Sequence, residues 1–202
     1  MMLIVAGTAS AHQPNYVNDK TWVKITEPEI SKAYYGILPD KSVKYVISGI
    51  VPFSLYVNLL VPDLPEINQN ISALVMYQDG KVVARLEGDK FKWTRWYEEF
   101  AGDWYWKGPE FKQIVSAGTY TIIVYSSDNN WDKYVLATGE TESFSISKYP
   151  EMEKQIYAIK TEFFGKAWYT IFQGKIGKYQ LLVTILIFLF VFLGPLVKRK
   201  KV

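Results

Sequence analysis

The chain has 202 residues, of which 49% are hydrophobic and 16% aromatic, so it can form a folded domain with a sizeable core. It has no cysteine and a single histidine, His12, which excludes disulfides, thiolate metal sites, cysteine nucleophiles and multi-histidine metal centres. The net charge of +3 comes from four basic residues at 198–201; the rest carries 19 basic and 20 acidic residues, so we expect no nucleic-acid partner.

The first eleven residues are mostly apolar and end in Ala9-Ser10-Ala11, a pattern typical of a signal-peptidase site. The basic residue that usually precedes the apolar run of a signal peptide is missing. We therefore expect residues 1–11 to be a clipped signal peptide whose true start codon lies upstream, with cleavage after Ala11. The alternative interpretation is a frayed N-terminus.

Residues 12–148 carry the pattern of an all-β domain. β-branched and aromatic residues dominate short runs that recur about every 8–12 residues with turn residues between them. The clearest hairpin turns at Asp79-Gly80, a dipeptide that favours a tight turn between two twisted strands. The spacing predicts a jelly-roll-like β-sandwich. The runs are 22–25, 33–38, 43–48, 53–61, 73–77, 82–86, 111–115, 119–125, 134–138 and 142–146.

The densest chemical feature is residues 91–111, a predicted long loop that holds nine aromatic side chains. Long loops carry function on many β-scaffolds, and exposed aromatic rings stack on sugars, bind cations or anchor a protein partner. Alternatively, the segment folds back and its aromatic rings form a small core over one sheet face. The candidate binding residues are Trp93, Trp96, Tyr97, Trp104, Tyr105 and Trp106.

Two groups of acidic residues raise the question of catalysis or metal binding. The segment 91–111 includes the carboxylates of Glu98 and Glu99, but adjacent residues of an extended chain point to opposite sides and make a poor acid–base pair for glycoside hydrolysis. We expect neither an enzyme nor a cofactor. The turn at 128–132 has oxygen ligands that suit Ca²⁺ but lacks EF-hand spacing, and such turns usually bond to their own backbone. The weak calcium candidates are Asp128, Asn130 and Asp132.

After residue 148 the hydrophobic period becomes helical. Pro150 suits the first turn of a helix, and four apolar residues recur on one face at a spacing of three or four. This stripe can pack on the sandwich, on a partner helix or on a lipid surface. We expect residues 149–178 to form a juxtamembrane helix and linker. The stripe consists of Met152, Ile156, Ile159 and Phe163.

Residues 179–197 predict one C-terminal transmembrane helix. The part 181–197 contains no charged residue, and at 1.5 Å per residue the segment spans roughly 25–29 Å, close to the thickness of the bilayer core. Because basic residues prefer the cytoplasmic side, the tail 198–202 predicts a cytoplasmic C-terminus and an extracytoplasmic N-terminal domain. The sequence therefore predicts a single-pass protein of the cytoplasmic membrane.

Two stretches of residues 43–146 carry a resemblance to a known family. SALVMYQDGKVVARL combines two strands around the Asp-Gly turn, and AGTYTIIVYSSDNNWDKYVLATG combines two strands around a turn rich in Asp and Asn. These stretches resemble bacterial and archaeal envelope β-sandwiches related to the pre-peptidase C-terminal domain. The resemblance implies a non-catalytic jelly-roll-like module that binds a ligand or presents a neighbouring domain. The aromatic insertion 91–111 departs from the family pattern.

These features lead to one expected function and one alternative. We expect a membrane-anchored accessory or structural subunit that docks onto another membrane protein or complex, with the lipid bilayer as its other partner. The alternative is a module that binds carbohydrate or an envelope polymer through the aromatic segment 91–111, in which case the partner is a glycan.

Overall fold

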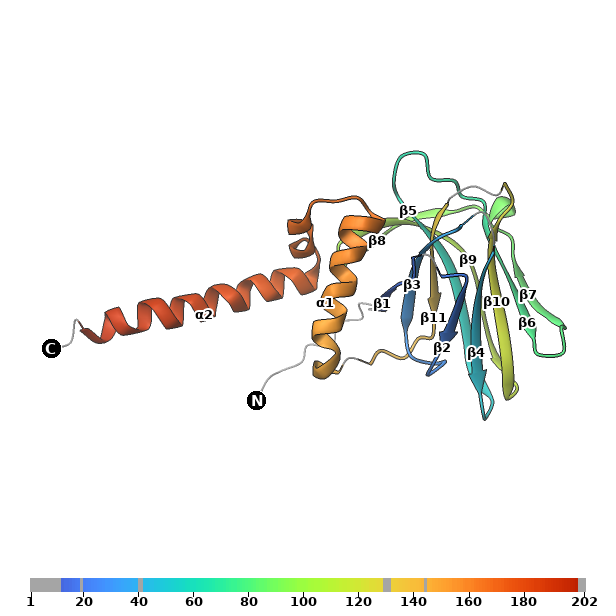
Figure 1. Ribbon diagram of the computed structural model, residues 1–202, viewed down its shortest axis with the longest axis horizontal. Helices are drawn as coiled ribbons and strands as arrows, with labels where there is room; N and C mark the ends of the chain where they lie inside the picture. Colours follow the sequence, from blue (N-terminus) through green and yellow to red (C-terminus); the bar gives the residue numbers. More distant parts are fainter. Residues whose placement is uncertain (1–11, 19, 40–41, 129–131, 144, 200–202) are drawn as a thin grey trace.

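The structure, a computed structural model, describes residues 12–18, 20–39, 42–128, 132–143 and 145–199, without the side chains of 146, 176, 190 and 192–199. The predicted signal peptide, residues 1–11, lies outside the described residues. Two β-sheets stack face to face (Figure 1), which confirms the predicted β-sandwich. One sheet has six strands in the order β1 (Gln13–Tyr16), β3 (Lys32–Ile37), β11 (Lys133–Thr138), β5 (Phe53–Pro62), β9 (Asp103–Val115) and β8 (Thr94–Glu98). The other has five, in the order β2 (Trp22–Ile25), β4 (Val43–Gly49), β10 (Gly118–Ser126), β6 (Ile71–Tyr77) and β7 (Val82–Leu86).

The main core lies between the two sheets. Alternate residues of the strands point inward, as the pattern of buried Val43, Tyr45 and Ile47 in β4 shows. Tyr45 and Tyr134 meet across the sheets with their hydroxyl oxygens 2.8 Å apart, so each buried hydroxyl has a hydrogen-bond partner. Each fully buried aliphatic side chain contributes roughly 1.5–3 kcal/mol, so this layer provides most of the stability of the domain.

A second, smaller core lies on the outer face of the six-stranded sheet. There α1 (Tyr149–Ala158) and the helical turn η3 (Ile159–Phe163) cover the sheet (Figure 1). Ile156, Ile159 and Phe163 of the predicted stripe are buried against it. Of the three surfaces that the sequence left open for this stripe, the sandwich is the one it contacts in the structure.

The aromatic segment 91–111 is not a long loop, and this prediction was wrong. It forms a β-hairpin in which β8 pairs with the first residues of the long strand β9, and the turn between them is residues 99–102. Gly102 closes that turn with a φ of +79°, a conformation that favours glycine. The hairpin extends the six-stranded sheet at the edge beside β9.

Two further differences concern the ends of the domain. The predicted strand 142–146 is wrong: Gly139, with a φ of +67°, turns the chain out of the sheet, and Ile146–Lys148 is a short helical turn, η2. The sequence also missed β1, which pairs in parallel with β3 at an edge of the six-stranded sheet. The segment of β1, Gln13–Tyr16, is largely polar and shows no hydrophobic alternation. A further short helical turn, η1 (Gly88–Lys90), follows β7.

The C-terminal part leaves the sandwich through η4 (Trp168–Phe172) and continues as the projecting helix α2 (Lys175–Arg199), drawn in red in Figure 1. In α2 the side chains of 181–189 and of Val191 are exposed. Over the residues that the structure describes, no helix has an apolar stretch long enough to cross a membrane. The predicted span 179–197 continues into residues 192–197, whose side chains lie outside the described part.

Candidate functional site

The β8–β9 hairpin distributes its aromatic side chains over both faces of the sheet. In the register of the hairpin, Trp96 lies opposite Tyr105, and Tyr97 lies opposite Trp104. Directly opposite residues share a face, and successive pairs alternate. Trp96 and Tyr105 therefore face α1 and the second core, whereas the pair Tyr97–Trp104 lies on the other face.

Two of the six predicted binding residues are buried. Trp93 is 6% exposed in the main core, where its indole N–H donates to Gly88 O at 2.8 Å. Tyr105 is 2% exposed in the second core, with its hydroxyl 3.2 Å from that of Tyr35. Burial raises the pKa of Tyr105 well above its ordinary value. Trp96 and Trp106 are partly buried against the two cores. Of these four side chains, Trp96 and Tyr105 pack in the core over a sheet face, whereas Trp93 and Trp106 pack in or against the main core between the sheets.

The remaining two, Tyr97 and Trp104, are 38% and 44% exposed and form a surface cluster. Their ring centroids are 4.9 Å apart, and the Arg95 guanidinium lies 4.3 Å from the centroid of Trp104. Asp63 fixes the cluster at its other end: it forms an ion pair with Arg95 at 2.7 Å and accepts a hydrogen bond from Trp106 Nε1 at 3.1 Å. Flat rings beside a positioned guanidinium are suited to stacking on a sugar ring or on another aromatic group.

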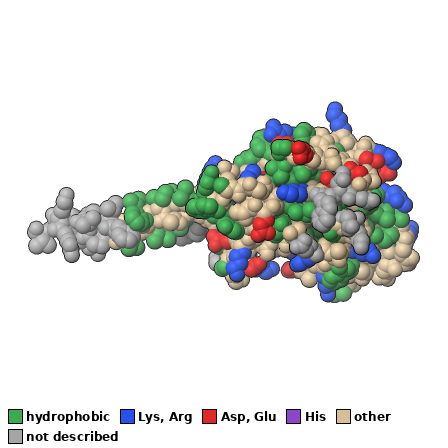
Figure 2. Space-filling model, turned by 45° about the horizontal axis from the view of Figure 1, so that its top comes forward, with side chains coloured by type: hydrophobic (Ala, Val, Ile, Leu, Met, Phe, Trp, Pro, Cys, Tyr) green, Lys and Arg blue, Asp and Glu red, His purple; other side chains and the backbone are tan. Residues whose placement is uncertain are grey.

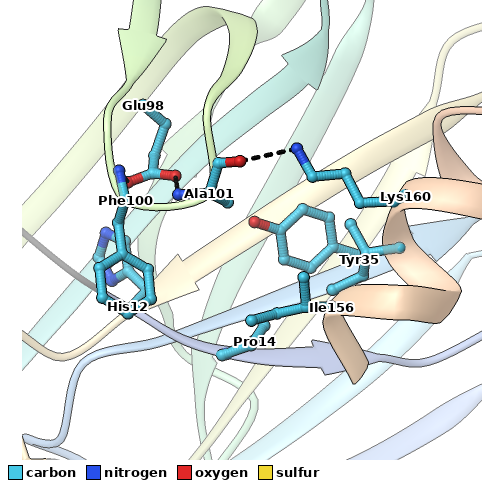
Figure 3. A pocket seen from close by; sticks show the side chains of 9 residues that line it. His12, Pro14, Tyr35, Glu98, Phe100, Ala101, Ile156 and Lys160 are labelled. Atoms are coloured by element: carbon cyan, nitrogen blue, oxygen red, sulfur yellow. Dashed lines mark hydrogen bonds between the residues drawn. The ribbon is translucent and has the colours of Figure 1, made fainter. Parts of the chain in front are cut away.

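The tip of the hairpin carries a buried ionic cluster that fastens it to the C-terminal segment. Asp103 accepts from Lys160 Nζ at 2.6 Å and from Lys166 Nζ at 2.7 Å. Lys160 also donates to Ala101 O at 2.7 Å, drawn as the dashed line in Figure 3. The side chains of Lys160 and Asp103 are 1% and 0% exposed. Burial lowers the pKa of Lys160, and the neighbouring carboxylate of Asp103 opposes this shift.

Four more contacts hold the hairpin tip. Glu98 accepts hydrogen bonds from the backbone N–H of Phe100 at 2.7 Å and of Ala101 at 2.6 Å, which orders the turn. Burial raises the pKa of Glu98, although these two N–H donors oppose the shift. The Glu99 carboxylate forms an ion pair with Lys175, and the Glu99 backbone carbonyl accepts a hydrogen bond from the backbone N–H of Lys175 at 3.0 Å. We call the contacts of residues 98–103 with Lys160, Lys166 and 174–175 the hairpin clamp.

The hairpin clamp depends on a close approach of two backbones. A Cβ atom on Gly102 would lie 2.7 Å from Gly174 N, and one on Gly174 would lie 2.1 Å from Phe100 O. Both distances are too short for a side chain, so only glycine allows this contact without a shift of the backbone. The start of α2 is therefore seated directly on the hairpin tip.

A small cavity lies beside the clamp, between the hairpin turn, β1 and α1. Its volume of about 30 Å³ has room for roughly one water molecule. Figure 3 shows Tyr35, Glu98, Ile156 and Lys160 around it, with His12 at its side. His12 Nδ1 is 2.5 Å from Ser31 Oγ, and burial lowers the pKa of His12 to about 4. The cavity is too small for a substrate.

Two of the three calcium candidates, Asp128 and Asp132, have protein partners. Ser126 Oγ donates to Asp128 Oδ1 at 2.6 Å and to Asp132 Oδ2 at 3.0 Å, so this turn bonds to itself. Asn130 lies outside the described residues. Within the described part of the chain, no group of three His, Asp or Glu side chains is placed to hold a metal ion.

Sequence reasoning missed the ionic cluster of the clamp. One signal was present: Lys160 follows Ile156 by four residues and therefore falls on the apolar face of the helix. A lysine on a buried face requires a partner. The partner, Asp103, lies 57 residues away, and no local pattern connects the two.

Comparison with known proteins gives a likeness to solved structures. No protein-family model matches the chain, and no curated protein matches it. Among solved structures, the chain matches the pre-peptidase C-terminal domain of a collagenase from Bacillus anthracis. The match has 13% identity and a TM-score of 0.35, and covers 62% of this chain and 94% of that one. It concerns the domain type that the sequence resembles, and at this level of similarity it says nothing of ligand or activity.

Proposed function

We propose that this protein is a non-catalytic accessory subunit. In this proposal its jelly-roll-like sandwich lies outside the cytoplasmic membrane, 179–197 is a single transmembrane helix, and the chain docks onto another membrane protein or complex. The observation that carries the proposal is the hairpin clamp. A domain that needs only tethering is served by a flexible linker. Here buried charges and two touching glycines fix the start of α2 on the sandwich, so the domain holds a set orientation relative to its anchor.

The chemistry of α2 supports the membrane anchor. Leu182, Ile185 and Phe188 are each more than 45% exposed in the isolated chain, as are apolar residues on the other sides of the helix. Contiguous exposed apolar surface of this kind is unfavourable in water and favourable in lipid. The four basic residues at 198–201 follow directly, as expected for a cytoplasmic end.

A groove beside the anchor supports docking onto a membrane partner. It has a volume of about 460 Å³ and lies between α1, η4 and the first turns of α2. Ile156, Tyr157, Ile171 and Phe172 give it an apolar lining, and Gln180 and Thr184 of α2 contribute polar groups. Such a groove next to a transmembrane helix suits a helix of the partner.

The test uses the absence of cysteine from the chain. Two single-cysteine variants are made, one at Ile50, which is 98% exposed on the sandwich, and one at Lys201 in the tail. Each variant is treated in intact cells with a membrane-impermeant maleimide. We expect Ile50→Cys to react at once and Lys201→Cys to react only after permeabilisation. The tagged chain is then purified from native membranes in mild detergent, and the proteins that co-purify with it are identified by mass spectrometry. A chain that is released from membranes by alkaline carbonate, or that is purified alone, contradicts the proposal.

The exposed cluster of Arg95, Tyr97 and Trp104 supports a second candidate function, binding of a carbohydrate or envelope polymer. The Arg95 guanidinium lies 4.3 Å from the centroid of Trp104, the rings of Tyr97 and Trp104 are 4.9 Å apart and tilted by 48°, and the cluster remains open to solvent. Co-sedimentation with purified envelope polysaccharide tests this candidate. We expect the double variant Tyr97→Ala, Trp104→Ala to lose binding. Tyr157→Ala, which removes a similarly exposed aromatic side chain on α1, is the matched control and should leave binding unchanged.

A further inference from the structure

Two large aromatic side chains of η4 are exposed although the segment around them is tightly packed. Trp168 and Tyr169 are each 59% exposed, with ring centroids 6.0 Å apart. The next residue, Thr170, is buried, and its hydroxyl donates to Ala167 O at 2.7 Å. Neither aromatic residue belongs to the two cores. The fold of η4 therefore does not account for the exposure of two such rings.

The position of η4 relative to α2 is fixed. A Cβ atom on Gly177 would lie 2.1 Å from Ile171 O, so the first turn of α2 crosses η4 in direct backbone contact. Tyr179, on the same turn of α2, is 69% exposed. Figure 2 shows hydrophobic side chains where the helix joins the globular part. Trp168, Tyr169 and Tyr179 therefore lie at the base of the exposed apolar helix.

We infer that η4 lies in the headgroup region of the bilayer, with Trp168 and Tyr169 inserted at the level where hydrocarbon meets water. This inference rests on the proposed membrane anchor. Tryptophan and tyrosine have apolar rings with one polar group, and this combination is most stable at that level. Exposed Lys178, in the first turn of α2, adds attraction to anionic headgroups.

A lipid surface fits this position better than a protein partner. A bilayer surrounds a transmembrane helix on every side, so a segment in contact with the base of α2 meets headgroups whichever side it occupies. A protein partner covers one side only. Contact of η4 with the membrane also adds to the effect of the hairpin clamp. The clamp fixes the sandwich relative to α2, and the contact of η4 fixes the angle between the sandwich and the bilayer.

The experiment reconstitutes the full chain in vesicles of phosphatidylcholine with a minority of phosphatidylglycerol. An environment-sensitive fluorophore is attached to single cysteines at Ala167, Leu186 or Ile50, all three exposed and none of them part of the aromatic pair. Lipids carry a spin-label quencher either near the headgroup or near the chain end. We expect the shallow quencher to reduce emission at Ala167 about twofold, because an interfacial position lies at the level of the headgroups. We expect the deep quencher to act at Leu186 and neither to act at Ile50.

The outcomes separate the inference from the function on which it rests. Quenching at Leu186 without quenching at Ala167 overturns the inference and leaves the membrane anchor standing. Absence of quenching at both positions overturns the anchor itself. Replacing Trp168 and Tyr169 by serine in the Ala167→Cys chain should reduce quenching by the headgroup quencher to the level seen at Ile50. Unchanged quenching would show that the two rings do not hold η4 at the membrane surface. Both rings are exposed, so this variant keeps the fold, which circular dichroism checks.

Discussion

Lys160 Nζ lies 2.6 Å from Asp103 Oδ2, and these two fully buried side chains join parts of the chain that are 57 residues apart. A buried ion pair is often no more stable than an apolar pair of the same size, but removing one partner leaves a charge without compensation. The pair therefore makes the docking of the C-terminal segment specific to one position on the hairpin tip.

Asp103→Ala should lower the free energy of unfolding by about 3–5 kcal/mol, because the buried ammonium group of Lys160 then lacks its compensating carboxylate. Denaturant unfolding of the full chain in detergent, followed by tryptophan fluorescence, measures this. The control is Glu140→Ala, which removes an exposed partner of Lys112 in an ion pair of 2.7 Å and should cost less than about 1 kcal/mol. Equal costs for the two variants would show that the buried pair has no special role.

Gly174→Ala should loosen the joint between the sandwich and α2, since its Cβ would be 2.1 Å from Phe100 O. We expect faster proteolysis between residues 164 and 178 while the main core stays intact. The control is Gly80→Ala, where φ is +86° but no atom lies within 4 Å of the new Cβ. That variant should cost only about 1 kcal/mol of backbone strain and leave the joint resistant. Similar cleavage rates in both variants would argue against the close approach.

The stability of the domain should rise as the pH increases from about 4 to 6.5, because burial lowers the pKa of His12 to about 4. Between these values the unfolded chain binds a proton that the folded chain does not, so the unfolding free energy increases with pH, by at most about 3 kcal/mol. His12 is the only histidine in the chain. His12→Asn should flatten this dependence in detergent unfolding curves; an unchanged curve would assign the dependence to other groups.

Trp93→Ala and Trp104→Ala should differ in their effect on stability, because one removes a core side chain and the other a surface side chain of the same region. Trp93 is 6% exposed and its removal should cost about 3–5 kcal/mol, whereas Trp104 is 44% exposed and its removal should have little effect on stability. Thermal unfolding of the two variants measures the difference. If Trp104→Ala destabilises as much as Trp93→Ala, the surface cluster is structural and does not provide a binding platform.

Local chemistry made part of this fold predictable. At the β6–β7 hairpin, Asp79 accepts a hydrogen bond from the backbone N–H of Lys81 at 2.9 Å and Gly80 adopts a φ of +86°, as expected for an Asp-Gly turn. The helix stripe was equally readable, since Ile156 and Phe163 follow a helical period and are buried. Each of these signals lies within about ten residues of sequence.

What the sequence could not predict depends on contacts between distant residues. The strand β1 is ordered by its parallel pairing with β3 and by the bond from Tyr16 N–H to Gln155 Oε1, neither of which its own residues encode. The many rings of the β8–β9 hairpin show no alternation of apolar and polar residues, so its sequence predicts a loop. In the structure both faces of this hairpin contact other parts of the domain. The transmembrane helix, the jelly-roll type and the docking function stay predictions.

The position of β1 has a consequence for the order of folding. This strand, near the beginning of the chain, lies between β3 and α1, and its bond to Gln155 spans 139 residues. Contacts of such sequence separation form late, because the intervening chain must first lose its freedom. Because a chain is made from its N-terminus, the contact of β1 with α1 therefore forms only after residue 155 has been made. Closure of this contact is thus a late step of folding that requires nearly the whole domain.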